Sequence, residues 1–269
     1  MNYFHFLPSG VGKCTVDAYL QTGGRSPEMA ERKLPAVVIC PGGAYQMVSD
    51  REGEPVAKEF FQAGYHVFLL RYTLGADAAD FKPMCQLAAT VAHIRNHAEQ
   101  WLLDENKIAV CGFSAGGHLA ASLGTLYREE KFLKVWQRND PIRPDAMILG
   151  YPVITADEYA HELSIETVSG GKVGSAAYAW FGLDRHVDGQ TPPAFLWHTA
   201  ADEAVPVENS LRFAAALSAA KVPFELHILP EGYHGMSVCT REVGSEDAYN
   251  RRWVEWSIAW LNRQFSFKL

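Results

Sequence analysis

The sequence predicts an α/β fold, with a mostly parallel central sheet of about eight strands and helices on both of its faces. Two observations lead to this prediction. Six short runs are almost continuously hydrophobic, as in strands that are buried on both sides of a parallel sheet. Segments with helical periodicity separate these runs, and such alternation is typical of a sheet covered by helices. The runs are Ala36–Cys40, His66–Arg71, Ile108–Cys111, Ala146–Gly150, Ala194–His198 and Phe224–Leu229.

The helical segments are recognised by apolar residues that return on one face. The clearest example is the stripe of Leu87, Val91, Ile94, Ala98 and Trp101, whose spacing predicts an amphipathic helix. Helices are also predicted over Glu52–Gln62, with Pro55 in the first turn, and over Glu208–Ala220.

The two ends of the chain carry weaker signals. Two runs near the N-terminus, Tyr3–Leu7 and Cys14–Leu20, predict antiparallel edge strands. A C-terminal helix carries Trp253, Trp256 and Trp260 at helical spacing. Such a stripe could form a platform for stacking sugars, but aromatic residues at this spacing are far more often packed against a sheet. We therefore assign them to the core.

A length of 269 residues suits one large domain with a substantial core. We therefore expect residues 1–269 to form a single domain. The segment Thr155–Pro193 is too long for a plain connection between two strands, and it contains a helix-like patch at Ala176–Phe181. Insertions of this kind in α/β enzymes form a lid or a pocket wall at the carboxyl end of the sheet, and we expect the same here.

Composition excludes several classes of function. The net charge of −7, without a cluster of Lys and Arg, argues against a nucleic-acid partner. No apolar run approaches twenty residues, which argues against a membrane span. The start MNYFHFLPSG lacks the pattern of a secretory signal, and the five cysteines have the spacing of neither a disulfide framework nor a zinc site. These features predict a cytoplasmic protein.

One motif carries a specific chemical signal. The stretch GFSAGGH, from Gly112 to His118, directly follows a predicted strand and precedes a helix expected to begin near Gly116 or Gly117. A turn this sharp forces strained backbone angles on Ser114, and Gly112 and Gly116 leave the space that it needs. We therefore predict that Ser114 is a nucleophile. The alternative is a tight glycine turn without chemistry.

A serine nucleophile needs a base, and the base needs a carboxylate that orients it. Where the serine lies on such a turn, the acid and then the histidine follow it on loops after later strands. Asp202 follows the strand Ala194–His198, and His234 lies in the loop EGYHG after the next strand. These two residues are the predicted acid and base. Glu203 is the alternative acid, although a solvated loop charge explains it.

The reaction also needs N–H donors for the negative oxygen of its intermediate. The residue after the nucleophile, Ala115, supplies one predicted donor, and the loop CPGGAY supplies Gly43 and Ala44, with Gly42 as the alternative. The same glycines could form a plain turn. Four aromatic residues near these loops are predicted to line the substrate pocket, namely Tyr45, Trp180, Phe181 and Tyr233.

Two other groups of polar residues have simpler explanations. His93 and His97 are four residues apart on one helix and could hold a metal ion, but no acidic third ligand lies nearby, and an exposed helix face explains them better. Arg51, Glu52 and Glu54 flank a helix start and are explained by capping and by the helix dipole. We predict no metal and no organic cofactor.

Taken together, these blocks resemble the α/β-hydrolase superfamily over essentially the whole chain. The likeness is greatest to the small esterase/lipase branch that includes acetylxylan esterases and feruloyl-esterase-like enzymes. The blocks that carry it are CPGGAY with DREGEPVA, GFSAGGHLAA, TPPAFLWHTAADEAVPVENS and EGYHG. Relatives of hormone-sensitive lipase have HGGG where this chain has PGGAY, and commonly an acidic residue where it has Phe113. Both departures favour the acetylxylan-esterase-like branch.

The resemblance implies a serine carboxylesterase that removes short acyl groups through an acyl-enzyme. The substrate it implies is a small ester, namely an acetylated, xylan-type oligosaccharide. Alternatives are a short-chain esterase or lipase-like enzyme for other esters, a serine peptidase, and a non-catalytic ligand-binding protein on the same fold. A peptidase of the prolyl-oligopeptidase kind usually needs a large gating domain, for which 269 residues leave no room. The sequence leaves assembly into a homo-oligomer open.

Overall fold

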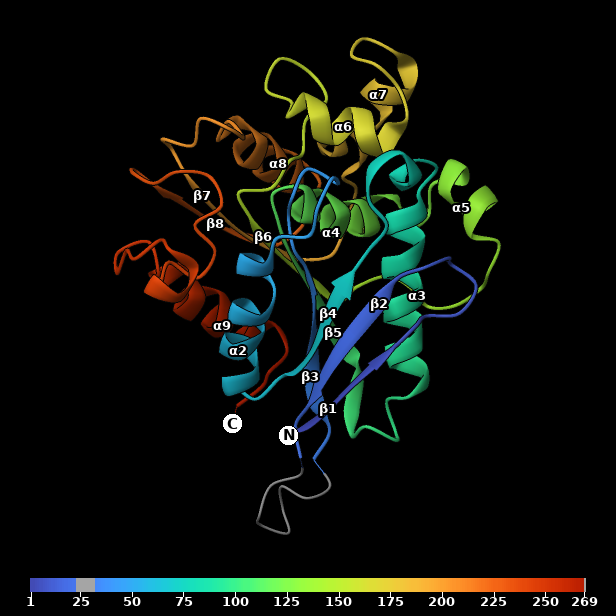
Figure 1. Ribbon diagram of the computed structural model, residues 1–269, viewed down its shortest axis with the longest axis vertical. Helices are drawn as coiled ribbons and strands as arrows, with labels where there is room; N and C mark the ends of the chain where they lie inside the picture. The colour runs from blue at the N-terminus through green and yellow to red at the C-terminus, as the bar shows by residue number, and fades with distance from the viewer. Residues whose placement is uncertain (23–31, 269) are drawn as a thin grey trace.

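A central sheet of eight strands runs through the described part of the chain, residues 1–22 and 32–268 of a computed structural model (Figure 1). The strands lie in the order β1-β2-β4-β3-β5-β6-β7-β8. β1 and β2 pair in antiparallel fashion, as do β2 and β4, and all the other pairs are parallel. The predicted α/β fold is therefore confirmed. The strands are β1 (Asn2–Phe6), β2 (Thr15–Leu20), β3 (Leu34–Cys40), β4 (His66–Arg71), β5 (Leu103–Phe113), β6 (Ala146–Gly150), β7 (Ala194–Thr199) and β8 (Phe224–Leu229).

Helices cover both faces of the sheet and bury two separate cores. α2 (Glu54–Gln62) and α9 (Arg252–Gln264) pack on one face, and α3 (Lys82–Asn96), α4 (Ala115–Leu126) and α8 (Glu208–Ala219) pack on the other (Figure 1). Successive side chains of a strand point to opposite faces. Thus Val37 and Ile39 of β3 join the first core, whereas Val38 joins the second. This explains why the strands read as continuous hydrophobic runs.

The tryptophans of α9 pack against the sheet, as predicted. Trp253 and Trp260 are buried, and the ring of Trp253 stacks on that of Trp197 in β7 with their centres 5.0 Å apart. Trp256 stacks on His227 of β8 at 4.4 Å. These rings are therefore part of the core and its margin.

Several element boundaries differ from the predicted ones for local reasons. β5 begins at Leu103 rather than Ile108, because Leu103 already pairs with Leu34 although the residues between are polar. The helix predicted over 52–62 is divided at Gly53 into a 3₁₀ turn, η1 (Asp50–Glu52), and α2. α3 begins at Lys82 and ends at Asn96, so Trp101 lies beyond it. α4 begins at Ala115, directly after the serine.

His93 and His97 lie in a ring stack rather than on an open helix face. Their ring centres are 4.1 Å apart, and the stack continues to Phe6 of β1 on one side and to Trp101 on the other. Burial lowers the pKa of His93 to about 4, so its ring is neutral at pH 7. The edge strand β1 thus covers a surface of α3 that the sequence alone left exposed.

The segment between β6 and β7 contains three short helices that lie together near the top of Figure 1. They are α6 (Glu162–Ser169), α7 (Ala176–Trp180) and η3 (Leu183–His186). Asn209 of α8 fixes the start of the segment, because its side-chain oxygen accepts from the amides of Ile154 at 2.8 Å and Thr155 at 2.9 Å. The remaining short elements are η2 (Gly75–Ala78), α5 (Glu130–Trp136) and η4 (Arg241–Val243).

Two findings concern the class of protein. Among residues 1–22 and 32–268, no helix combines the length and the hydrophobicity that crossing a bilayer requires. All five cysteines are buried as free thiols. Cys40 and Cys111 lie wholly inside the sheet layer, where they pack as small apolar side chains.

Candidate active site

Ser114 occupies a strained turn at the carboxyl end of β5. Its backbone angles are φ 53° and ψ −123°, a combination that side chains other than glycine rarely adopt. A Cβ atom on Gly112 would lie 2.1 Å from the carbonyl oxygen of Gly116, and one on Gly116 would lie 2.0 Å from that of Cys40. Both positions therefore have to be glycine, for the reason that the sequence indicated.

The structure brings together three side chains from loops that are far apart in the sequence. His234 Nε2 lies 2.8 Å from Ser114 Oγ, and His234 Nδ1 lies 2.7 Å from Asp202 Oδ2. Ser114 and Asp202 are almost wholly buried, whereas His234 is partly exposed. With Nδ1–H donating to the carboxylate, Nε2 is free to accept the proton of the serine hydroxyl. This arrangement can deprotonate Ser114.

The carboxylate of Asp202 is held from four directions. Its Oδ1 accepts from the amides of Ala204 and Val205, both at 2.9 Å, and Oδ2 lies 3.4 Å from His198 Nε2 as well as close to His234. Burial acts to raise the pKa of Asp202, but hydrogen bonds from His198 and His234 and the charge of His234 outweigh it. The pKa therefore lies well below its usual range, and the group stays ionised.

His198 lies in the predicted strand Ala194–His198, and it is fully buried in β7. Its Nε2 also lies 2.9 Å from the carbonyl of Val205, and its Nδ1 lies 2.8 Å from Ser210 Oγ. A carbonyl can only accept, so Nε2 carries the hydrogen and donates toward Asp202. One signal in the sequence could have indicated this contact: His198 and Asp202 are four residues apart, on either side of the end of a strand. Glu203, the alternative acid, is exposed.

The loop after β3 presents backbone amides toward the same edge of the sheet. Gly43, Ala44 and Tyr45 all have positive φ angles, of 125°, 56° and 58°. Within the described ranges, the amides of Gly43, Ala44 and Ala115 donate to no other protein group. The amide of Gly42, the alternative donor, is engaged: it donates to Glu52 Oε2 at 2.7 Å. Gly43 and Ala44 thus remain available, whereas Gly42 does not.

The four aromatic residues predicted for the pocket lie in different settings. Tyr45 is fully buried, and its hydroxyl lies 2.9 Å from His118 Nδ1. Phe181 is buried too, and its carbonyl accepts from His118 Nε2 at 3.1 Å. Trp180 is half-buried against Phe81, and Tyr233 is half-exposed with its hydroxyl 2.7 Å from Ser245 Oγ. Their contact with a substrate stays a prediction.

Two further titratable residues near this edge were not recognised from the sequence. Glu52 is buried, with 3% of its surface exposed, although capping of an exposed helix start was the expected role. His161, which precedes α6, has a lowered pKa because of burial and because of the charge of His234. Glu52 lies in the block DREGEPVA, but nothing in that block assigns it to the site, and only the folded chain brings Glu52 and His161 near His234.

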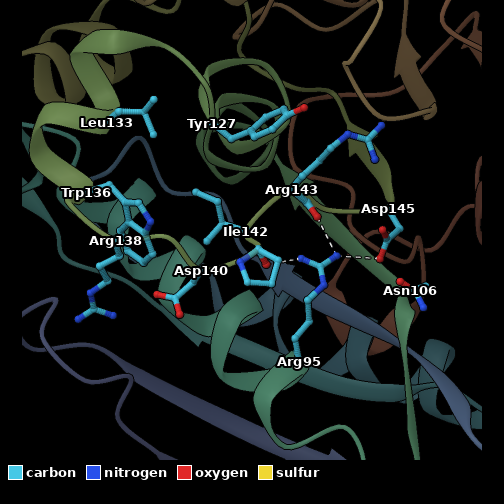
Figure 2. Close-up of a pocket in the computed structure, with 11 residues that line it drawn as sticks. Arg95, Asn106, Tyr127, Leu133, Trp136, Arg138, Asp140, Ile142, Arg143 and Asp145 are labelled. Carbon is cyan, nitrogen blue, oxygen red and sulfur yellow. Dashed lines mark hydrogen bonds and ion pairs between the residues drawn. The ribbon is translucent and has the colours of Figure 1, made fainter.

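A cavity of about 360 Å³ lies elsewhere, and Figure 2 shows the residues that line it. Asn106 and Asp145 place it near the amino ends of β5 and β6, whereas Ser114 follows the carboxyl end of β5. Arg95 crosses it and donates to the carbonyls of Pro141 and Arg143 and to Asp145 Oδ2, at 2.6, 2.8 and 3.0 Å. Arg95 and Asp145 are thus bound to each other and to the backbone beside the cavity. Ligands in open α/β sheets bind at the carboxyl ends of the strands.

Comparison with known proteins places the chain in a family. The BD-FAE family profile matches residues 25–169, which is more than half of the chain. Endo-1,4-beta-xylanase B of Butyrivibrio fibrisolvens is 36% identical over 216 residues, which are 79% of this chain and 34% of that protein. An acetylxylan esterase of Xylanibacter ruminicola is 29% identical over 211 residues, which are 76% of this chain and 42% of that protein. The chain thus spans less than half the length of these curated relatives.

A solved structure resembles the chain over nearly its full length. The acetyl ester-xyloside bifunctional hydrolase of Caldicellulosiruptor lactoaceticus is 32% identical, with a TM-score of 0.81, over 97% of this chain and 92% of that one. The profile match and this likeness agree with the fold described above. The chain therefore belongs to the BD-FAE family, within the α/β-hydrolase superfamily.

Proposed function

We infer that the protein is a serine esterase in which Ser114 attacks the carbonyl carbon of a carboxylic ester. The observation that carries this proposal is the position of the His234 ring, with one nitrogen 2.8 Å from Ser114 Oγ and the other 2.7 Å from Asp202. His234 accepts the serine proton, while Asp202 holds the ring in the required tautomer and stabilises its positive charge. His234 then passes the proton to the leaving alcohol.

The negative oxygen of the tetrahedral intermediate is stabilised by the amides of Gly43, Ala44 and Ala115. These N–H groups have no other acceptor in the described part of the chain. Gly43 and Ala44 have positive φ angles, which orient their amides differently from those of a regular strand or helix. Each such donor typically lowers the barrier by about 3 kcal/mol. A water molecule, activated by His234, then attacks the acyl-enzyme and releases the acid.

The proposed substrate is a short acyl ester, above all an acetyl group on a xylan-type oligosaccharide. An acetylxylan esterase and an acetyl ester-xyloside hydrolase are among the similar proteins, which supports this class. The segment 155–193 is proposed as a lid-like pocket wall. Its helices α6 and α7 have only eight and five residues, too little to enclose a long acyl chain.

Ser114→Ala tests the chemistry of this proposal. The variant should keep the thermal stability of the wild type but lose about 10⁴-fold or more in kcat on p-nitrophenyl acetate, because no other nucleophile replaces the serine. A fluorophosphonate should label the wild type at one site and leave the variant unlabelled, as shown by intact-protein mass spectrometry. Equal labelling of both proteins would contradict the assignment.

The substrate class needs a separate measurement. Acetate release from acetylated xylo-oligosaccharides should exceed release from acetylated manno-oligosaccharides, with the products followed by mass. Acetyl esters should also react faster than butyryl and octanoyl esters of p-nitrophenol. Faster turnover of the octanoyl ester would favour the alternative, an esterase for non-sugar esters.

A further inference from the structure

Glu52 is a buried carboxylate directly behind the candidate active site. It ends the 3₁₀ turn η1 and has 3% of its surface exposed. Among the residues that the structure describes, no Lys or Arg forms an ion pair with it. Burial of an unpaired carboxylate costs several kcal/mol unless hydrogen bonds compensate. Its presence therefore requires an explanation beyond helix capping.

Both carboxylate oxygens of Glu52 accept hydrogen bonds from loops of the site. Oε2 accepts from the amide of Gly42 at 2.7 Å, in the loop that carries Gly43 and Ala44. Oε1 accepts from the hydroxyl of Tyr151 at 2.7 Å. A Cβ atom on Gly42 would lie 2.7 Å from Oε2, so only glycine lets the carboxylate reach this amide. One bond thus fixes the loop of the proposed oxyanion donors.

Tyr151 continues the connection to the loop of His234. Its oxygen accepts from the amide of Ser237 at 3.0 Å, three residues after His234. An amide N–H can only donate, so the single hydroxyl hydrogen of Tyr151 is directed at Glu52. The Tyr151 ring also meets the His234 ring edge to face, with 5.0 Å between centres. Tyr151 thus contacts the imidazole and holds its loop.

Ser237 is fixed by its other polar atoms to the turn of Glu52 and to α9. Its hydroxyl donates to the carbonyl of Arg51, which is adjacent to Glu52, and its own carbonyl accepts from Trp253 Nε1 at 2.8 Å. Ser237 has a φ angle of 53°, so these contacts hold a strained backbone in place. The turn Arg51–Glu52 therefore contacts both functional loops, one on each side.

We propose that Glu52 is a positioning residue that couples the oxyanion loop to the loop of His234, and that its negative charge favours the imidazolium formed when His234 takes the proton of Ser114. This proposal rests on the proposed serine esterase function. Glu52 touches neither Ser114 nor the substrate site, and it acts through Gly42 and Tyr151. Two acceptor oxygens are needed for two donors, which is the capacity of an ionised carboxylate.

The charged and titratable groups that face Glu52 come from several elements. They are Arg51 in η1, Tyr72 after β4, Cys111 in β5, Tyr151 after β6 and His234 after β8. The pKa of the Glu52 carboxyl is raised, because burial outweighs the hydrogen bonds of Tyr151 and Gly42 and the charges of His234 and Arg51, which lower it. His234 in turn faces Asp202 and His161.

The test compares Glu52→Gln, Tyr151→Phe and the double variant. Glutamine has an NH₂ donor in place of one carboxylate oxygen, so the two positions that face Gly42 and Tyr151 cannot both accept. A shift of about 1 Å in a catalytic loop can cost about 10²-fold in rate. We therefore expect kcat per fluorophosphonate-titrated site to fall about 10²-fold in E52Q and about tenfold in Y151F, with KM within about twofold of the wild type. The double variant should be no slower than E52Q, because both changes break one connection.

A pH profile separates this role from a merely structural one. Loss of the negative charge should move the acid limb of kcat/KM to lower pH in E52Q, whereas Y151F keeps the charge and should keep the limb in place. Glu54→Gln is the matched control, because Glu54 is two residues away and exposed. It should leave both kcat and the profile unchanged.

Each outcome of these experiments either supports or overturns the inference. An active wild type that a fluorophosphonate labels, together with an E52Q variant of wild-type kcat and unshifted profile, overturns the inference but leaves the proposed function intact. If S114A is as active as the wild type, the proposed function fails first. If E52Q does not fold, Y151F decides alone: a lower kcat at unchanged KM supports the coupling, and wild-type kcat overturns it.

Discussion

The two ends of the sheet carry charged side chains in very different states. At the amino ends of β5 and β6, the cavity of Figure 2 contains Arg95 and Asp145, bound to each other at 3.0 Å and to nearby backbone groups. At the carboxyl ends, Glu52 is buried without a cation, and three amides have no acceptor in the described residues. At the amino ends, Arg95 and Asp145 thus have hydrogen-bond partners for their charged atoms. The other end has unused hydrogen-bonding capacity.

Backbone strain also differs between the two ends of the sheet. Of twelve non-glycine residues with positive φ in the described part of the chain, six lie in loops after β3, β5, β6 and β8, and none lines the cavity of Figure 2. Such residues cost on the order of 1–3 kcal/mol each and persist where the surrounding structure holds them. The six are Ala44, Tyr45, Ser114, Tyr151, Ser237 and Cys239. Strain and unused amides therefore gather at the candidate site and not at the cavity of Figure 2.

Asp202→Asn should give the largest effect at the carboxyl end. An Asn amide placed at the Oδ2 position would face the hydrogens of both His198 Nε2 and His234 Nδ1, so His234 would turn to the tautomer that cannot accept the serine proton. We expect kcat to fall about 10⁴-fold while the fold persists. Steady-state kinetics on p-nitrophenyl acetate, with circular dichroism, measure both quantities.

The control for this variant is Glu203→Gln, which changes the adjacent exposed carboxylate. It should leave kcat unaltered. If Glu203→Gln were the slower of the two, the acid of the triad would be Glu203, and the described hydrogen bonds would not be those of the working enzyme.

Arg95→Ala should show the opposite pattern, a loss of stability without loss of activity. Arg95 and Asp145 are 11% and 23% exposed in their side chains, so removal of the guanidinium leaves a largely buried carboxylate and the carbonyls of Pro141 and Arg143 without their donor. We expect the free energy of unfolding to fall by about 3 kcal/mol in urea titrations, with unchanged kcat.

Lys134→Ala is the matched surface change, because Lys134 pairs with Glu130 while 72% exposed. Its cost should stay below about 1 kcal/mol. A drop in kcat for a fully folded Arg95→Ala variant would instead mean that the two ends of the sheet are coupled.

The parts of the site that depend on local geometry could be predicted from the sequence. Gly112, Ser114 and Gly116 signal a sharp turn because their spacing reflects a steric requirement within five residues. Asp202 and His234 follow successive strands, and parallel strands bring their carboxyl ends to one edge. The strands themselves were visible because burial on both faces makes them continuously hydrophobic.

The parts of the site that depend on contacts between distant segments could not be predicted from the sequence. Glu52 meets Tyr151 across 99 residues, and nothing in DREGEP distinguishes a buried carboxylate from a helix cap. The engagement of Gly42 by Glu52 was hidden for the same reason, and so was the stack of His93 with Phe6. The start of β5 was missed because its residues 104–107 are polar. Pairing, not hydrophobicity, makes them a strand.

Tyr45→Phe gives the smallest expected effect. It tests whether the Tyr45 hydroxyl stabilises the core or contacts the substrate. Tyr45 lies in the oxyanion loop, yet its hydroxyl points inward to His118 Nδ1 at 2.9 Å. Burial lowers the pKa of His118 to about 4, so the ring is neutral at pH 7 and Nδ1 is an acceptor, since Nε2 donates to the carbonyl of Phe181. Without Tyr45, the hydroxyl of Ser122, at 3.4 Å, can still supply a hydrogen.

The single variant should therefore lose only about 1 kcal/mol of unfolding free energy, and Tyr45→Phe with Ser122→Ala should lose about 3 kcal/mol, more than the sum of the single changes, because the buried nitrogen is then left without a donor. Urea titrations of the four proteins give this coupling directly, and kcat should change less than about threefold in the single variant. A raised KM at constant kcat would instead place the Tyr45 hydroxyl against the substrate, as its position in the sequence predicts. Tyr45 would then belong to the reactive edge of the sheet rather than to the packing behind it.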